Sequence, residues 1–137
     1  MNQTFRILFV DDEPWLSEAL RISMECRGFD CISKTNASAA WQILEKGNVD
    51  VVVTDIMMPG GDLFDEVNSE ETGFEFIRRI RQRWPRQSII CLSVIADTSK
   101  IEALKKKSIL YLRKGETPLA TAIKLIESKA TGKTSFY

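Results

Sequence analysis

Short apolar runs alternate along the chain with segments in which apolar residues recur every three or four positions. The runs have the length and the β-branched content of buried strands, and they predict strands at residues 5–10, 29–33, 51–53, 88–93 and 110–113. The periodic segments predict amphipathic helices at residues 14–27, 37–46, 74–84, 99–107 and 118–129. Strands and helices therefore alternate along the chain.

Proline and glycine stand where these helices are expected to begin and end. Pro14 suits a first helical turn, and Gly28 and Gly47 suit helix C-termini. Pro85 ends the third helix. Five strand–helix units in one domain predict an α/β fold of three layers, with helices on both faces of a doubly wound, five-stranded parallel sheet.

Polar side chains follow four of the predicted strands. Asp11 and Asp12 follow the first, Asp55 follows the third, Ser93 ends the fourth, and Lys114 follows the fifth. In open parallel sheets the functional site lies at the carboxyl ends of the strands. These residues are therefore expected to converge at one edge of the sheet.

Converging carboxylates repel one another, and a hard divalent cation relieves that repulsion. Mg²⁺ prefers a few carboxylate oxygens together with water and phosphate oxygens. Asp12 and Asp55 suit it as ligands, Asp11 suits it through water, and the backbone carbonyl of Met57 is a further candidate.

An ionised Asp55 is a competent nucleophile toward phosphorus, because aspartyl phosphates are established covalent intermediates. A transferred phosphoryl group carries negative charge that the site must balance. The Lys114 ammonium and the Ser93 hydroxyl are the candidate donors to it. The chemistry expected at this edge is magnesium-assisted phosphorylation of Asp55.

Each of these residues also has a purely structural explanation. Asp12 before Glu13 is a plausible helix N-cap, and Asp55 a plausible turn residue. Ser93 can be a strand-end hydroxyl and Lys114 a solvated charge. Their joint position at the ends of separate strands favours the functional interpretation.

Composition narrows the class of protein. The 137 residues are 44% apolar, and 19 basic residues balance 19 acidic ones, so neither nucleic acid nor a membrane surface is an expected partner. No apolar run reaches the roughly 20 residues of a membrane span, and the N-terminus is not typical of a signal peptide. Cys26, Cys31 and Cys91 suggest buried thiols in a reducing cytoplasm. Histidine is absent, so a phosphohistidine donor must be another molecule.

Five sequence segments resemble the receiver domain of bacterial two-component response regulators. They are ILFVDDEP at 7–14, VVVTDIMMPG at 51–60, GFEFIRRIR at 73–81, IICLS at 89–93 and YLRK at 111–114. The resemblance implies a flavodoxin-like fold of strand order 2-1-3-4-5. It also implies a receiver domain over residues 1–130, followed by a tail at 131–137.

The resemblance further implies roles for individual residues. Asp55 would accept the phosphoryl group from a sensor histidine kinase or a histidine phosphotransfer protein. Asp11 and Asp12 would hold Mg²⁺, and Ser93 and Lys114 would bind the phosphoryl group. Ser93 and Tyr111 would reorient, changing a surface formed by the fourth helix, fifth strand and fifth helix. That surface would bind a downstream protein or a second copy, so the output is binding rather than enzymatic turnover.

The segment between Gly60 and Gly73 is longer than in typical receivers by about eight residues. It carries five carboxylates, on Asp62, Asp65, Glu66, Glu70 and Glu71. We expect a solvated loop here. The alternative is a lid or a partner-recognition element that controls access to Asp55.

Four single positions also depart from the receiver pattern. Val94 follows Ser93, where receivers commonly have a small residue, and could narrow the site. Met57 and Ile95 are apolar where receivers often have polar residues that position water, which predicts slow autodephosphorylation. Gly115 stands where receivers commonly have proline, which predicts a looser loop and a less fixed Lys114.

The basic residues away from the site are expected to be solvated helix faces. They are Lys105, Lys106, Lys107, Arg78, Arg79, Arg81, Arg83 and Arg86.

Two alternative functions stay open on the sequence. One is a degenerate receiver that acts unphosphorylated as a scaffold, which Val94, Gly115 and the long segment suggest. The other is a phosphatase of the haloacid-dehalogenase type, which needs a second acid two residues after its nucleophilic Asp. The segment Asp11-Asp12-Glu13 offers an acid at that spacing, but the glycine-threonine that should follow is absent. The chain is either a stand-alone regulator or one domain of a longer one.

Overall fold

All five predicted strands are present and form one parallel sheet. The computed structural model describes residues 4–13, 15–68, 71–94 and 98–132. The strands are β1 (Arg6–Val10), β2 (Asp30–Lys34), β3 (Val51–Thr54), β4 (Ser88–Ser93) and β5 (Leu110–Arg113). Every neighbouring pair is parallel, and the spatial order is β2-β1-β3-β4-β5. The predicted strand order is confirmed.

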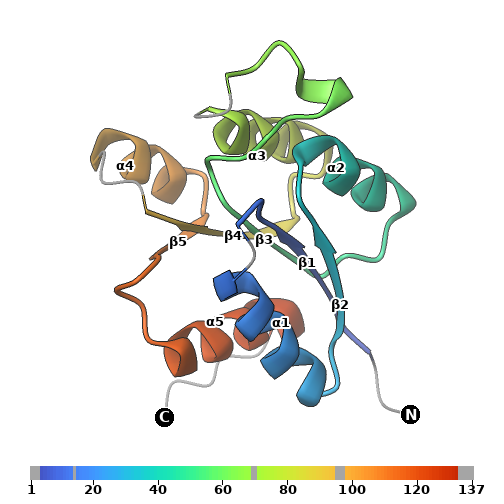
Figure 1. Cartoon of the computed structure of the whole chain (residues 1–137), viewed down its shortest axis with the longest axis vertical. Helices are drawn as coiled ribbons and strands as arrows, with labels where there is room; N and C mark the ends of the chain where they lie inside the picture. The colour runs from blue at the N-terminus through green and yellow to red at the C-terminus, as the bar shows by residue number, and fades with distance from the viewer. Residues whose placement is uncertain (1–3, 14, 69–70, 95–97, 133–137) are drawn as a thin grey trace.

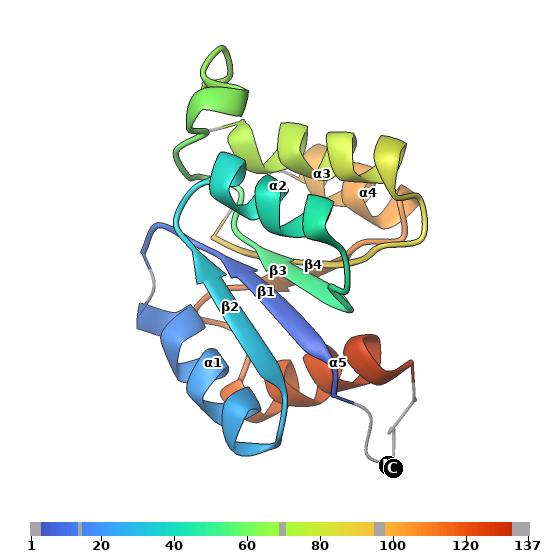
Figure 2. The same ribbon diagram turned by 90° about the vertical axis from the view of Figure 1, so that its right-hand side faces the viewer.

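Helices cover both faces of this sheet (Figures 1 and 2). They are α1 (Trp15–Cys26), α2 (Ala37–Lys46), α3 (Thr72–Arg83), α4 (Thr98–Lys106) and α5 (Leu119–Thr131). α1 and α5 lie on one face, and α2, α3 and α4 lie on the other. The predicted three-layer, doubly wound α/β fold is therefore confirmed.

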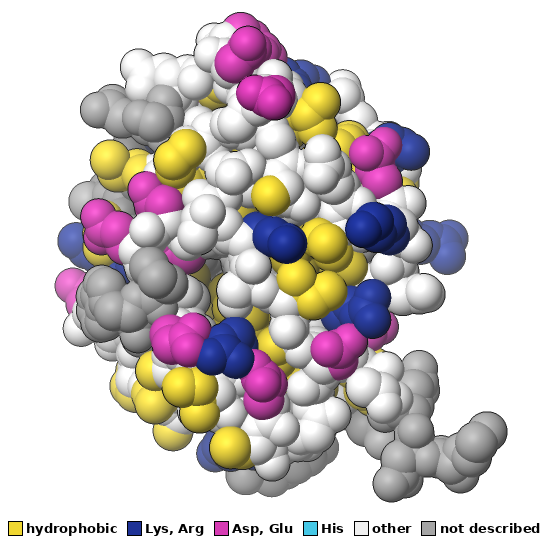
Figure 3. Space-filling view, turned by 45° about the vertical axis from the view of Figure 1, so that its right-hand side comes forward, with side chains coloured by type: hydrophobic (Ala, Val, Ile, Leu, Met, Phe, Trp, Pro, Cys, Tyr) yellow, Lys and Arg dark blue, Asp and Glu magenta, His cyan; other side chains and the backbone are white. Residues whose placement is uncertain are grey.

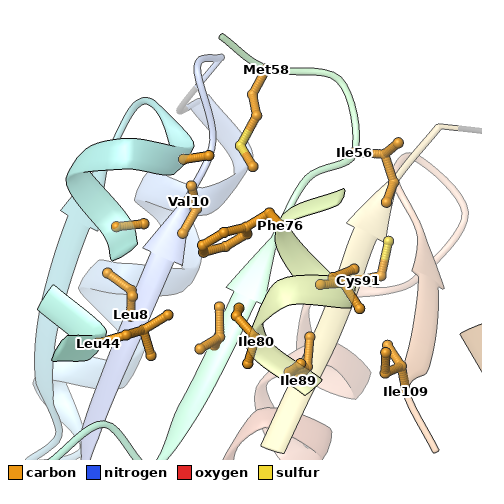
Figure 4. Close-up of a cluster of buried hydrophobic side chains, with 14 of the residues drawn as sticks. Leu8, Val10, Leu44, Ile56, Met58, Phe76, Ile80, Ile89, Cys91 and Ile109 are labelled. Carbon is orange, nitrogen blue, oxygen red and sulfur yellow. The ribbon is translucent and has the colours of Figure 1, made fainter. Parts of the chain in front are cut away.

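The strands are apolar throughout because both of their faces are buried. Leu8 and Val10 of β1 point toward Leu44 of α2 and toward Phe76 and Ile80 of α3 (Figure 4). The alternate residues of β1 and β3 belong to a second core cluster, formed with α1 and α5. Each fully buried aliphatic or aromatic side chain contributes about 1.5–3 kcal/mol, so these two clusters provide the main stabilisation of the fold.

The helix ends largely follow the sequence signals. Asn36 caps α2 by accepting a hydrogen bond from the Ala39 amide, and Gly47 follows its last turn with a positive φ of 84°. Pro14 lies outside the described residues. α5 extends to Thr131, two residues beyond the predicted end, because Gly132 supplies the left-handed cap with a φ of 71°.

The long acidic segment at residues 60–72, here called the insertion, is not the solvated loop that the sequence suggested. It contains a short 3-10 helix, η1 (Asp62–Phe64), and the Phe64 side chain is only 1% exposed. Phe64 packs edge-on against Trp41 and Phe76. Asp62, Asp65, Glu66 and Glu71 are exposed as expected, whereas Glu70 lies outside the described residues. The expectation is wrong for Phe64, which is buried.

The arginines of α3 are more than a solvated helix face. Arg79 lies over the Phe64 ring at 4.3 Å and donates to Glu66 at 2.6 Å. Arg81 donates to the backbone carbonyls of Lys107 and Gln87, and Arg83 donates to Glu45 of α2. These arginines link α3 to its neighbours, whereas Lys105, Lys106 and Lys107 are exposed as expected.

Figure 3 shows basic and acidic side chains interspersed with apolar ones on one face, with acidic groups at the top over the insertion. Among the described residues, no helix has the length and hydropathy needed to cross a membrane.

Candidate functional site

The register of the sheet brings the predicted acidic residues together. Val10 of β1 lies beside Thr54 of β3, so the residues that follow each strand are neighbours. The Asp55 amide donates to the Val10 carbonyl at 2.9 Å. Asp11, Asp12 and Asp55 each place a carboxylate oxygen within 4.8 Å of the others. Asp11 and Asp55 are buried, and Asp12 is exposed.

Lys114 joins this group from the end of β5. Its ammonium nitrogen lies 2.8 Å from Asp11 Oδ2 and 2.7 Å from Asp55 Oδ2. The side chain is only 8% exposed, and the Lys114 amide donates to the Ser93 carbonyl at 2.8 Å. One cation therefore bridges the two buried carboxylates.

Gly115 follows Lys114 with a φ of 82°, a conformation that proline cannot adopt. The loop after β5 therefore differs from a proline-containing one, as the sequence indicated. The expectation of a less fixed Lys114 stays a prediction, although two carboxylates contact its buried ammonium.

Burial and pairing act in opposite directions on these groups. Burial raises the pKa of Asp11, the hydrogen bond from Lys114 lowers it, the nearby Asp55 charge raises it, and the pKa lies above its ordinary value. Burial alone lowers the pKa of Lys114, but its hydrogen bonds to Asp11 and Asp55 outweigh burial and raise it. At neutral pH the site therefore holds a firmly charged Lys114 beside an Asp11 carboxylate whose charge is incompletely compensated.

The Asp55 side chain is oriented by the backbone that follows it. Its Oδ1 atom accepts a hydrogen bond from the Ile56 amide at 2.6 Å, while Oδ2 faces Lys114. α3 begins against this same turn, because the Gly73 amide donates to the Ile56 carbonyl at 2.8 Å. A Cβ atom on Gly73 would lie 2.3 Å from Ile56 Cα, so only glycine permits this approach.

A cavity of about 430 Å³ opens at this end of the sheet. Its lining residues are Asp12, Glu13, Asp55, Met57, Met58, Pro59, Val94 and Lys114. The Met57 and Val94 side chains are exposed, and Met57 is 45% accessible. The cavity thus combines charged groups with an apolar rim, and it has room for a phosphoryl group. Ile95 lies outside the described residues.

The Ser93 hydroxyl is buried and has no hydrogen-bond partner among the described residues. Leaving a buried hydroxyl unpaired costs about 1–3 kcal/mol, which a ligand oxygen would recover. Ser93 directly precedes Val94 of the cavity lining. Ser93 itself does not line the cavity. The three carboxylates fit a hard cation, and the Ser93 hydroxyl retains an unused hydrogen bond.

Tyr111 lies in β5, and β4 separates it from β3 and Asp55. Its hydroxyl donates to the backbone carbonyl of Ser93 at 3.3 Å, and Tyr111 does not line the cavity. Burial raises the pKa of the Tyr111 phenol, so it remains protonated. Tyr111 therefore contacts the end of β4, which carries Ser93.

Sequence reasoning missed three contributors. Glu13 lines the cavity, and its amide donates to Asp11 Oδ1 at 2.9 Å, which orients that carboxylate. Met58 and Pro59 complete the lining on the Asp55 side. Glu13 directly follows Asp11-Asp12, and Pro59 lies in the segment just after Asp55, so their positions in the sequence could have predicted that they line the cavity.

A family model for the response regulator receiver domain matches residues 7–124. The chain belongs to this family. Response regulator GtcR of Aneurinibacillus migulanus is 28% identical over 119 residues, which are 87% of this chain and 45% of GtcR. Transcriptional regulatory protein BasR of Escherichia coli (strain K12) is 35% identical over 78 residues, 57% of this chain and 31% of BasR. The chain spans less than half the length of these relatives.

The fold of solved receiver structures is the same. The crystal structure of a CheY-like receiver domain protein from Methanospirillum hungatei JF-1 superposes with a TM-score of 0.78 at 17% identity. The match covers 95% of this chain and 96% of that one. Receiver domains are regulatory modules rather than classical enzymes, and membership supports a phosphorylation-dependent signalling role for this chain. The family match gives no support to the phosphatase alternative.

Proposed function

We infer that Asp55 accepts a phosphoryl group from the phosphohistidine of a partner kinase or phosphotransfer protein, and that the chain is the receiving switch of a phosphorelay. The observation that carries this is the Lys114 bridge, which points one buried ammonium at both Asp11 and Asp55 beside a cavity. Lys114 balances one of the two buried carboxylates, so a bound divalent cation would supply the further positive charge that a phosphoryl group needs.

In the proposed transfer an Asp55 carboxylate oxygen forms a bond to phosphorus while the phosphorus–nitrogen bond to the donor imidazole breaks. The imidazole leaves with the bonding electrons and takes up a proton. Lys114 balances charge on the phosphoryl oxygens, and the Ser93 hydroxyl gains the partner that it lacks. Mg²⁺, held by Asp11, Asp12, Asp55 and the Met57 carbonyl, would supply the remaining positive charge.

The output of the proposed switch is a change in a binding surface. A group drawn to Ser93 acts on the strand end that Tyr111 also contacts, so a shift there is transmitted to β5. α4 and α5 flank β5, and this surface is the proposed site for a downstream protein. Although BasR is named a transcriptional regulatory protein, we expect no direct contact of this chain with nucleic acid.

The test is labelling with acetyl phosphate in the presence of Mg²⁺, followed by mass spectrometry of the intact protein. We expect one phosphoryl group per chain in the wild type and none in Asp55→Asn. Asp65→Asn removes an exposed carboxylate on the insertion and serves as the matched control, with labelling unchanged. Labelling of Asp55→Asn, or none of the wild type, would contradict the proposal.

The scaffold alternative has an observation in its favour, because Val94 places a branched side chain at the cavity rim. It predicts no labelling with Mg²⁺ and acetyl phosphate, and partner binding that is the same in Asp55→Asn as in the wild type.

A further inference from the structure

The N-terminus of α2 is hydrogen-bonded to the backbone at residues 59 and 60, at the end of the loop that follows Asp55. The Ala37 amide donates to the Pro59 carbonyl at 3.2 Å, and the Ser38 amide donates to the Gly60 carbonyl at 2.9 Å. The first amides of a helix have no partner within the helix, so they are available for such contacts. The end of the Asp55 loop is thus attached to a rigid element.

The Ser38 side chain reinforces this attachment. It is 7% exposed; its hydroxyl donates to the Gly60 carbonyl at 2.7 Å and accepts from the Leu63 amide at 2.7 Å. The hydroxyl therefore joins the two sides of the turn at Gly61. Gly61 has a φ of 75°, which favours glycine, and a Cβ atom at this position would lie 2.7 Å from Ser38 Oγ.

The outer part of the insertion is fixed to α3. Phe64 is buried beneath the Arg79 guanidinium, and Arg79 also donates to the Leu63 carbonyl at 2.9 Å. The described residues of the insertion do not line the cavity. The contacts therefore describe a brace between α2 and α3, and they do not support a lid over Asp55.

We propose that the insertion is an internal brace for the loop at residues 56–60, and that Ser38 is the positioning residue that fastens it. This rests on the proposed function, because that loop carries the Met57 carbonyl assigned to Mg²⁺. A loop held in place before the ion arrives needs less ordering when the ion binds. Loss of the Ser38 hydroxyl therefore weakens Mg²⁺ binding while the chemistry of Asp55 is retained.

Two measurements on the Ser38→Ala variant test this. Hydrogen exchange of the metal-free protein should be about tenfold faster for amides in 56–63, because the Leu63 amide and Gly60 carbonyl lose a partner. The Mg²⁺ dissociation constant from calorimetry should rise about three- to tenfold. Phosphorylation by acetyl phosphate at saturating Mg²⁺ should stay within about twofold of the wild type.

Ser23→Ala is the matched control, because among the described residues the Ser23 hydroxyl donates to the Ala19 carbonyl of the same helix, at 2.9 Å. It should leave both measurements unchanged. Gly61→Ala places a methyl group against the Ser38 hydroxyl and so disturbs the same hydrogen bonds. It should reproduce the Ser38→Ala effects and provides the test if Ser38→Ala folds poorly.

A lower Tm in Ser38→Ala with wild-type exchange in 56–63 and an unchanged Mg²⁺ dissociation constant would overturn the brace. This outcome is distinct from failure of the proposed function. Neither exchange nor Mg²⁺ binding requires phosphorylation, so a wild type that binds Mg²⁺ but is never labelled contradicts only the phosphoryl-acceptor role.

Discussion

Met57 places an exposed apolar side chain on the rim of a cavity that also holds Asp55 and Lys114. Water that attacks an aspartyl phosphate must be held in line with the bond that breaks, and a thioether offers it no strong hydrogen bond. Val94 adds a second apolar group to the same lining. If Asp55 is phosphorylated as proposed, this apolar rim predicts a long-lived phosphorylated state.

We predict that the phosphorylated wild type loses its phosphoryl group with a half-life of minutes or longer. Met57→Asn supplies groups that can position water and should shorten this lifetime about tenfold, equivalent to about 1.4 kcal/mol. Release of inorganic phosphate from purified protein measures it. Leu63→Asn, at an exposed apolar residue away from the cavity, should have no effect. A wild-type half-life of seconds would contradict the prediction.

The burial of the Asp11 carboxylate leads to a second prediction, about stability and pH. Its pKa is raised by burial in the folded protein, so the folded state binds that proton more tightly than the unfolded state. The ionised Asp11 carboxylate therefore lowers the free energy of unfolding at pH values above its pKa in the folded protein. This loss of stability disappears as the pH falls toward the pKa of an unfolded Asp, about 3.9.

Asp11→Asn should accordingly raise the Tm of the metal-free protein near neutral pH by about 2 °C or more, and the gain should vanish in acid. The same change should remove most of the Tm increase that Mg²⁺ gives the wild type. Thermal melts with and without Mg²⁺ measure both effects, and Asp62→Asn is the exposed control. A lower metal-free Tm in Asp11→Asn would show that its pairing with Lys114 outweighs burial.

Helix α3 connects the site to the insertion. Gly73 in its first turn packs against the backbone at Asp55 and Ile56, and Arg79, further along the same helix, covers Phe64. Glu75 lies between them and accepts hydrogen bonds from Arg78 and Arg79, which lowers its pKa to about 2. Glu75 thereby holds Arg79 in place over the insertion.

The Glu75 contribution has a defined pH window. A lowered folded pKa stabilises the protein above the unfolded value of about 4.3, and this stability is lost as the pH falls to about 2. Glu75→Gln should therefore reduce the free energy of unfolding by about 0.5–1 kcal/mol near neutral pH and by almost nothing near pH 2. Urea denaturation at both pH values measures it. Glu102→Gln, in an exposed pair with Lys105, should change little at either.

At the scale of the whole molecule, α2 and α3 pack against the insertion. The strand β5 lies at the edge of the sheet, where α4 and α5 flank it (Figure 1). An edge strand keeps one row of backbone groups open to a partner, so this region is suited to binding. The contact of Tyr111 with the Ser93 backbone links it to the site.

We predict that phosphorylation, or a beryllofluoride mimic with Mg²⁺, promotes a homodimer through α4, β5 and α5. Sedimentation velocity should show a shift from monomer to dimer on addition of the mimic. Leu119→Lys, at an exposed residue of α5, should abolish the shift, whereas Ile22→Lys on α1 should preserve it. Loss of the shift in both variants, or a dimer without the mimic, would contradict this surface.

Much of the fold and of the site follows from the sequence alone. Parallel strands buried on both faces must be apolar throughout, so runs such as Val51–Val53 identify them without any partner in view. Parallel strands also end at one edge, so Asp11, Asp55 and Lys114 could be placed together before their contacts were known. These features are set by short-range pattern and by the topology that the pattern requires.

The tertiary structure alone decided how the insertion is arranged and what the buried groups contact. Phe64 stands among acidic residues without periodicity, and its burial depends on Trp41, Phe76 and Arg79 from α2 and α3. Ser38 looks like an ordinary residue of a helical first turn, and its role appears only when Gly60 and Leu63 lie against it. Contacts between distant segments depend on where the chain returns in space, which local pattern does not encode.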